Sequence, residues 1–256
     1  MKSLYTTRAA ARRMAIVFVC AFQLITSLSA DNYYWVNGSG DWSDFAGHWA
    51  KIPNPTLPAH YHANIPTDTS DVYFGDTNGG TAYTVNVNGA FTVPKCRNMD
   101  WTGVPAGTVW GGFGSRIEIY GSTTLDANMS ITFNGSVRMT SFEAGMKNIV
   151  SNTVHFGVET EFVGTAGGWN FVGDFHANGR VSHEGGLIET NGWKVTIGDN
   201  FYGNYYAQGG QLHLGGSEFK VYGSAFFKYT PAQFNAGTSH IIMVNANTFL
   251  SGPDLI

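Results

Sequence analysis

Two distant stretches of the chain share one pattern, Ser115-Arg-Ile-Glu-Ile-Tyr-Gly-Ser122 and Ser217-Glu-Phe-Lys-Val-Tyr-Gly-Ser224. After each serine, apolar and polar residues alternate, which is typical of a β-strand with one buried face. Looser versions lie at Asn170–Phe175 and Val195–Phe201. Each of these four strands has a glycine near its end, and these are Gly121, Gly173, Gly198 and Gly223. Successive glycines are separated by about once or twice the same number of residues. The chain is therefore predicted to repeat about every 25 residues.

A repeat of this length that is carried by strands predicts an all-β fold, a right-handed parallel β-helix or β-solenoid. The pairs Gly185-Gly186 and Gly209-Gly210, which are separated by nearly the same interval, agree with this period. Each turn would carry about three short strands, and successive turns would lie about 4.8 Å apart. We expect the inward apolar residues to stack into one ladder, which includes Ile117, Ile119, Val195, Ile197, Phe219 and Val221.

Two other all-β folds also repeat. A β-propeller blade needs about 40 residues, so the shorter period favours the solenoid. A β-sandwich built from repeated hairpins remains an alternative, because the sequence alone does not show whether neighbouring strands run parallel.

The N-terminus predicts a cleaved signal peptide over residues 1–30. Four basic residues, Lys2, Arg8, Arg12 and Arg13, precede the apolar run 14–25, and small residues follow up to Ala30. The apolar run is shorter than the roughly 20 residues that a membrane-spanning helix needs. We therefore expect cleavage after Ala30, a secreted or outer-surface location, and no membrane span in the mature chain.

Composition excludes several classes of protein. Residues 31–256 hold ten Lys and Arg against eighteen Asp and Glu, a formal net charge of −8, so nucleic acid is not an expected partner. Charged residues make up 12% of the chain and aromatic residues 14%, and 33 residues are glycine, which disfavours disorder and exposed helices. Cys96 is the one cysteine after residue 30, so it forms no internal disulfide, and we interpret it as a small buried apolar residue.

We divide the mature chain at residue 95. Residues 31–95 are rich in Trp and are interrupted by proline, which predicts an N-terminal cap module. Such a cap would cover the open strand edge at the end of a solenoid. Residues 96–256 would form the solenoid repeats.

The cap segment also carries a recognisable order of residues, Tyr33-Tyr-Trp-Val-Asn-Gly-Ser-Gly-Asp-Trp-Ser-Asp-Phe-Ala-Gly-His-Trp49, followed after a proline-containing loop by Asp71-Val-Tyr-Phe74. This order resembles the opening of very large secreted, adhesin-like β-solenoid repeat proteins of the Bacteroidetes, many of which use type IX secretion. The segments Cys96–Trp101 and Leu212–Ser217 are similar to later strands of that family. The resemblance implies an extracellular structural or adhesive role. Because the family usually continues through more repeats to a sorting domain, it also implies that this chain, which stops at Ile256, is an N-terminal fragment.

Asp174 and Asp199 are the sharpest candidates for chemistry. Each follows a strand-ending glycine, and one repeat length separates them. In register they would lie about 5 Å apart on adjacent turns, the separation of the two carboxylates in retaining glycosidases, and they could also share Ca²⁺. The alternative interpretation is that Gly-Asp is turn chemistry, and we favour it because Ser224 occupies the same position in the third repeat.

Histidines and aromatic residues supply the other candidates. His60 and His62 would share one face of a strand and could hold a metal with His48, but we favour the interpretation that they are solvated histidines of a proline-rich loop. The evenly spaced Trp35, Trp42 and Trp49 are interpreted as core of the cap rather than as a sugar-stacking platform. The better candidates for glycan contact are three tyrosines of an expected loop, Tyr202, Tyr205 and Tyr206.

The sequence thus predicts a non-catalytic extracellular segment with structural or adhesive function. No catalytic, metal-binding or cofactor-binding residue is assigned, and no cofactor is expected. Extracellular glycans or other surface proteins are the expected partners. A carbohydrate-binding module is the alternative, followed by a polysaccharide lyase or hydrolase on the same fold.

Overall fold

The computed structural model describes residues 30–76, 79–88, 92–114, 116–199, 203–245 and 250–251. The expected signal peptide falls outside these residues, except for Ala30. Asp31–Ile256 forms a compact unit that is almost entirely β-structure. Its described helical elements are α2 (Phe45–His48) and the 3₁₀ turn η1 (Pro58–His60).

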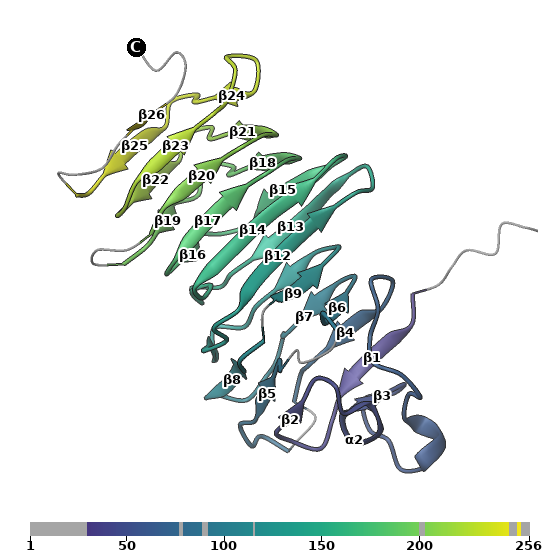
Figure 1. Ribbon diagram of the computed structural model, residues 1–256. Coiled ribbons are helices and arrows are strands. Elements are labelled where there is room, and N and C mark those ends of the chain that lie inside the picture. The colour runs from purple at the N-terminus through teal and green to yellow at the C-terminus, as the bar shows by residue number, and fades with distance from the viewer. Residues whose placement is uncertain are drawn as a thin grey trace, which may run out of the picture. The chain divides into compact units, whose positions relative to one another are not determined.

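The strands of this unit form a parallel β-solenoid with three faces, so the predicted fold is confirmed (Figure 1). Face 1 is a ten-stranded sheet, in chain order β1 (Asn32–Trp35), β3 (Trp49–Ala50), β4 (Asp71–Tyr73), β7 (Met99–Asp100), β10 (Thr123–Thr124), β13 (Met146–Val150), β15 (Gly168–Phe171), β18 (Leu187–Glu189), β21 (Gln211–His213) and β24 (Phe234–Asn235).

In most turns the chain passes from face 1 to face 2 and then to face 3. Face 2 holds one four-stranded sheet of β2 (Gly40–Asp41), β5 (Thr84–Asn86), β8 (Thr108–Gly111) and β11 (Met129–Ile131), and a second of β16 (Phe175–Ala177), β19 (Val195–Ile197), β22 (Glu218–Val221) and β25 (His240–Met243). Face 3 is an eight-stranded sheet of β6 (Lys95–Cys96), β9 (Arg116–Ile119), β12 (Ser136–Ser141), β14 (Glu159–Gly164), β17 (Arg180–His183), β20 (Tyr205–Ala207), β23 (Ala225–Phe227) and β26 (Leu250–Ser251). Between β13 and β14 the place of a face 2 strand is taken by an isolated bridge from Phe156 to Ala177.

The register of face 1 gives the length of each turn. One line of paired residues, which corresponds to about 25 residues a turn, runs through Val72, Met99, Thr123, Ile149 and Phe171. The adjoining line of paired residues runs through Trp169, Ile188, Leu212 and Phe234. The step from Trp169 to Ile188 spans fewer residues than any other step between paired positions of successive turns. The turns therefore vary around the expected length, because loops of different size leave the strands on each face.

The N-terminal edge of face 1 is closed by an antiparallel strand. β3 pairs antiparallel with β1, where Trp35 lies opposite Trp49, whereas β1 pairs in parallel with β4 on its other side. The Trp-rich cap thus covers the first rung of the stack. β4 also pairs with β7, so the sheet continues without interruption across the boundary that was drawn at residue 95.

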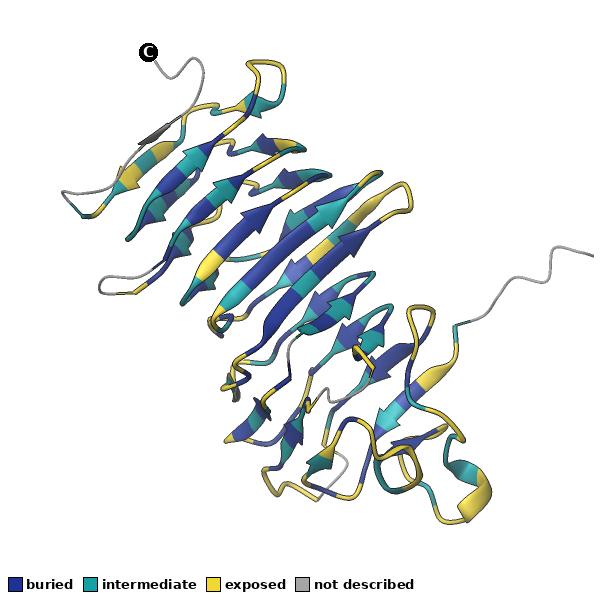
Figure 2. Ribbon diagram, viewed as in Figure 1, coloured by how far each residue is buried: buried dark blue, intermediate teal, exposed yellow. Residues whose placement is uncertain are grey.

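The interior is a continuous apolar core, and dark buried positions alternate along the strands in Figure 2. Ring stacking carries the core through the first turns: the ring centroids of Phe74 and Trp101 are 3.7 Å apart, those of Trp101 and Trp110 5.8 Å, and those of Trp110 and Phe133 6.1 Å. Cys96 is fully buried among these residues, as predicted.

The expected ladder was wrong in one respect. Val195 pairs with Phe219 and Ile197 with Val221 on face 2, but Ile119 lies on β9 of face 3. All five side chains are buried. The two stretches that end in Tyr-Gly-Ser are therefore similar because both have an inward apolar pattern, and not because they occupy the same place in successive turns.

The expected one-turn separation of Gly185-Gly186 and Gly209-Gly210 is confirmed, because the residues that follow them, Leu187 and Gln211, pair on adjacent turns. Gly186 and Gly210 lie before β18 and β21 with φ of +80° and +81°, a region that favours glycine, and a Cβ on Gly210 would lie 2.3 Å from the carbonyl oxygen of Gly186. The turns can stack here because no side chain separates them. Gly192 provides a contrast, since its φ is +82° but no atom lies within 4 Å of the position that a Cβ would take.

We predict that Gly210→Ala destabilises the fold by about 3 kcal/mol or more, because it adds a steric clash to the backbone strain of about 1–2 kcal/mol. The matched control Gly192→Ala should lose only the smaller amount. Urea denaturation followed by circular dichroism measures both. Equal losses in the two variants would show that close stacking at Gly210 does not matter.

Candidate functional site

A polar groove of about 330 Å³ lies on the outer side of face 2, over the second four-stranded sheet. Parallel strands place outward residues of successive turns in columns about 4.8 Å apart. The groove is therefore built from the same positions of several turns. It is lined by Thr153, His155, Asp174, Phe175, His176, Lys194, Thr196, Lys220 and Tyr222.

One column runs along the middle of the groove. Phe156 bridges to Ala177, which places His155 beside His176. His176 pairs with Thr196, and Thr196 pairs with Lys220. The four side chains alternate with the buried residues of their strands and therefore point away from the core.

The charges in the groove nearly cancel. The Lys194 ammonium lies 3.1 Å from a carboxylate oxygen of Glu218. The Asp174 carboxylate accepts a hydrogen bond of 2.9 Å from the backbone N–H of Lys194. The Lys220 ammonium lies 4.9 Å from the centre of the Tyr222 ring. The groove is lined by two lysines and one carboxylate, and Glu218 beside it pairs with Lys194, so these four groups together carry no net charge and offer both donors and acceptors.

The two histidines stack with ring centroids 3.5 Å apart. Nδ1 of His155 is 3.2 Å from the side-chain oxygen of Asn178. Burial and the neighbouring His155 lower the pKa of His176, which favours the neutral form of its ring. The ring of His176 also interacts with the backbone of Gly198, and its Nε2 is shielded from solvent.

The proposed pair of Asp174 and Asp199 is not brought together. Phe175 pairs with Val195 and Ala177 with Ile197, so Asp174 precedes β16 whereas Asp199 follows β19. In a parallel sheet these positions lie at opposite ends of neighbouring strands. Gly173 and Gly198, although one repeat length apart, therefore occupy different corners of the solenoid, and the dyad is wrong.

The suggested metal site of His48, His60 and His62 is also wrong. His48 stacks on Trp35 at 4.6 Å, and His62 stacks on Tyr33 at 3.5 Å. Nδ1 of His60 accepts a hydrogen bond of 3.1 Å from the backbone N–H of Thr56. Each histidine thus has its own structural partner, and the described residues contain no cluster of three or more potential ligands.

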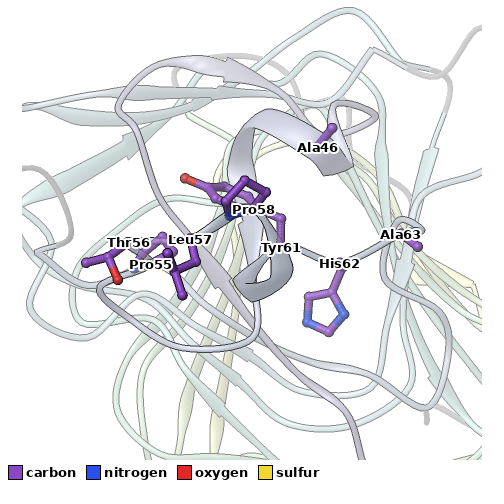
Figure 3. A pocket seen from close by; sticks show the side chains of 8 residues that line it. All are labelled: Ala46, Pro55, Thr56, Leu57, Pro58, Tyr61, His62 and Ala63. Carbon is purple, nitrogen blue, oxygen red and sulfur yellow. The ribbon is translucent and has the colours of Figure 1, made fainter.

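His62 instead lines an open pocket of about 650 Å³ in the cap (Figure 3). Its ring is held by a contact of 3.0 Å between Nε2 and the carbonyl oxygen of Asn32. Burial lowers the pKa of His62. The remaining lining is mostly small or apolar and consists of Ala46, Pro55, Thr56, Leu57, Pro58, Tyr61 and Ala63. It offers fewer polar groups than the groove on face 2.

The interpretation of the tryptophans is confirmed. The loop expected around Tyr205 and Tyr206 is wrong, because both lie on β20, and the expected exposure of Tyr205 is wrong as well. Trp35, Trp42 and Trp49 are almost completely buried, and Trp49 packs edge-on at 5.0 Å and 4.9 Å against the other two. Tyr205 is only 1% exposed and belongs to the core. Tyr206 points outward and stacks on Phe226 at 5.0 Å, so its contact with a glycan stays a prediction. Tyr202 lies outside the described residues.

A polar network fills part of the core between face 3 and face 1. Nδ1 of His183 lies 2.5 Å from the hydroxyl of Tyr229, which lies 2.6 Å from the hydroxyl of Tyr205. Nε2 of His183 is 3.2 Å from the carbonyl oxygen of Gly186. This arrangement fits a neutral ring that donates from Nε2 and accepts at Nδ1. Burial lowers the pKa of His183 to about 4.

The outer side of face 3 carries ion pairs between successive turns. Nε of Arg138 donates to Glu161 over 2.7 Å, and an Arg116 nitrogen lies 3.6 Å from the same carboxylate. Burial raises the pKa of Glu161, but the hydrogen bond and charge of Arg138, together with Ser136 and Arg116, hold it below its usual range. Lys95 extends the series through Glu118 at 3.3 Å.

The sequence did not predict the groove. Its strands were recognised, but the repeat was aligned to the wrong face, so the outward residues of β16, β19 and β22 were not seen as neighbours. A signal was available in the polar residues that alternate with core residues: His176 in Phe175–Ala177, Thr196 in Val195–Ile197 and Lys220 in Glu218–Val221.

We predict that acid weakens the fold through His183. Its pKa is near 6.5 when unfolded and about 4 when folded, so its contribution is present above pH 6.5 and is lost as the pH falls to 4. The loss is about 3 kcal/mol by linkage. Urea denaturation at pH 7 and pH 4 should show this extra loss in the wild type and in His155→Gln, but not in His183→Gln. The same loss in His183→Gln would exclude His183 as the cause.

We also predict that Glu161→Gln destabilises the fold by about 3 kcal/mol, because it leaves the Arg138 charge partly buried without its partner. The matched control is Glu159→Gln, which breaks the ion pair with the half-exposed Arg180. That pair should contribute less than about 1 kcal/mol. Urea midpoints at low and high salt compare the two, and a larger loss in Glu159→Gln would contradict the prediction.

Comparisons with protein-family models, curated proteins and solved structures find no match for this chain. Within the described residues, no helix has the length and apolar character needed to span a membrane. The assignment of function therefore depends on the geometry of the solenoid and its groove.

Proposed function

We propose that this chain is an extracellular segment with a structural or adhesive role, and that it acts without catalysing a reaction. The observation that supports this proposal is the continuous stack of parallel turns over one apolar core. Backbone groups of each turn bond to the turns before and after it, so the stack is stabilised without a disulfide. A stack of this kind can hold surface groups at fixed spacing.

The basic and apolar N-terminal segment supports export, as does the resemblance of Tyr33–Trp49 to secreted adhesin-like proteins of the Bacteroidetes.

We predict that the chain is exported, cut after Ala30, and adhesive. Expression in a bacterium, followed by fractionation and mass spectrometry, should find a product that begins at Asp31 outside the cytoplasm. Val17→Asp, which places a charge in the apolar run, should keep the chain inside the cytoplasm.

Adhesion is tested separately. Beads that carry the purified chain should stay on matrix-coated surfaces under flow better than beads that carry the urea-unfolded chain. A chain that stays uncut in the cytoplasm, or beads that do not differ, would overturn the proposal.

A further inference from the structure

We propose that the groove on face 2 binds an extended, neutral glycan that lies along the axis of the stack. This inference deepens the proposed extracellular role by naming the class of ligand that the segment contacts, and in that respect it rests on the proposed function. The groove itself is defined by Asp174, His176, Thr196 and Lys220, and His155 and Tyr222 also line it.

The spacing of the groove is the first reason. His155, His176, Thr196 and Lys220 lie on four successive turns and form one column. Neighbouring turns are about 4.8 Å apart, so the column spans roughly 14 Å. The rings of an extended polysaccharide repeat at nearly this spacing. Each sugar could therefore meet an equivalent position on a new turn.

The chemistry of the lining is the second reason. Sugar hydroxyls both donate and accept hydrogen bonds, and the column presents an imidazole that favours its neutral form, a hydroxyl and an ammonium. The Asp174 carboxylate adds an acceptor at the edge, where Lys194 N–H holds it in place.

The balance of charges in the groove is the third reason, and it favours a neutral ligand. Lys194 is neutralised by Glu218, and the charges of Lys220 and Asp174 oppose each other within the same groove. The rest of the chain after residue 30 carries a formal net charge of −8, which repels polyanions. The groove therefore has no excess positive charge that would attract an acidic polysaccharide.

The proposal can be tested with the purified full chain and defined oligosaccharides in calorimetric titrations. The probes are neutral β-1,4-linked glucose, mannose and xylose oligomers of two to six sugars, with a galacturonate hexamer as the charged comparison. At least one neutral series should bind, with affinity that rises up to about four sugars and then levels off, because the column covers four turns. The galacturonate hexamer should bind more weakly.

Variants place the binding in the groove. Thr196→Trp puts a bulky side chain in the middle of the column, on the outer side of β19, and should abolish binding. Lys220→Ala should weaken binding by about tenfold, the effect of one or two hydrogen bonds. The matched control Lys228→Ala, an exposed lysine that does not line the groove, should bind like the wild type. Urea midpoints would confirm that all three variants fold.

Absence of binding to every neutral series would overturn the proposal, as would wild-type affinity in Thr196→Trp or tighter binding of the galacturonate hexamer. These outcomes would leave the extracellular role intact, provided that the export and flow experiments succeed. Conversely, retention in the cytoplasm would overturn the extracellular role even if the groove bound a glycan. The two proposals can thus fail separately.

Discussion

The structure depends on hydrogen bonding of each turn to the turns on either side of it. Strands of three or four residues make too few contacts to be stable alone, and they persist because their N–H and C=O groups are paired in parallel ladders along three faces. The same pairing brings side chains of successive turns into contact. Trp101 and Trp110 stack inside the core, whereas Arg138 and Glu161 pair outside it. Packing, charge and the groove are all consequences of this register.

The register in turn depends on the corners. Gly186 and Gly210 lie directly above one another, and their positive φ values let the chain turn where a side chain would collide with the neighbouring carbonyl. Between the corners, loops of different length are tolerated, as the unequal steps along face 1 show. A fixed corner and variable loops explain how columns of equivalent residues are kept in line.

Much of the fold could be predicted from the sequence, but not the register. Alternating strands, glycine corners and a short, regular period were enough to identify a solenoid. They could not assign Ile119 and Ile197 to different faces, because every strand has the same inward apolar pattern whichever face it occupies. The same ambiguity produced the wrong Asp174–Asp199 pair and concealed the column of His176, Thr196 and Lys220, since columns exist only once the faces are known.

The antiparallel strand β3 gives the stack a polarity. Its pairing with β1 closes the N-terminal edge of face 1 to further parallel strands, so this sheet can grow in one direction, away from the cap. A polypeptide that is delivered with its N-terminus first can therefore use the cap as a template and add each new turn to a finished one. Assembly in this order never requires two distant parts of the chain to meet before the segment between them is in place.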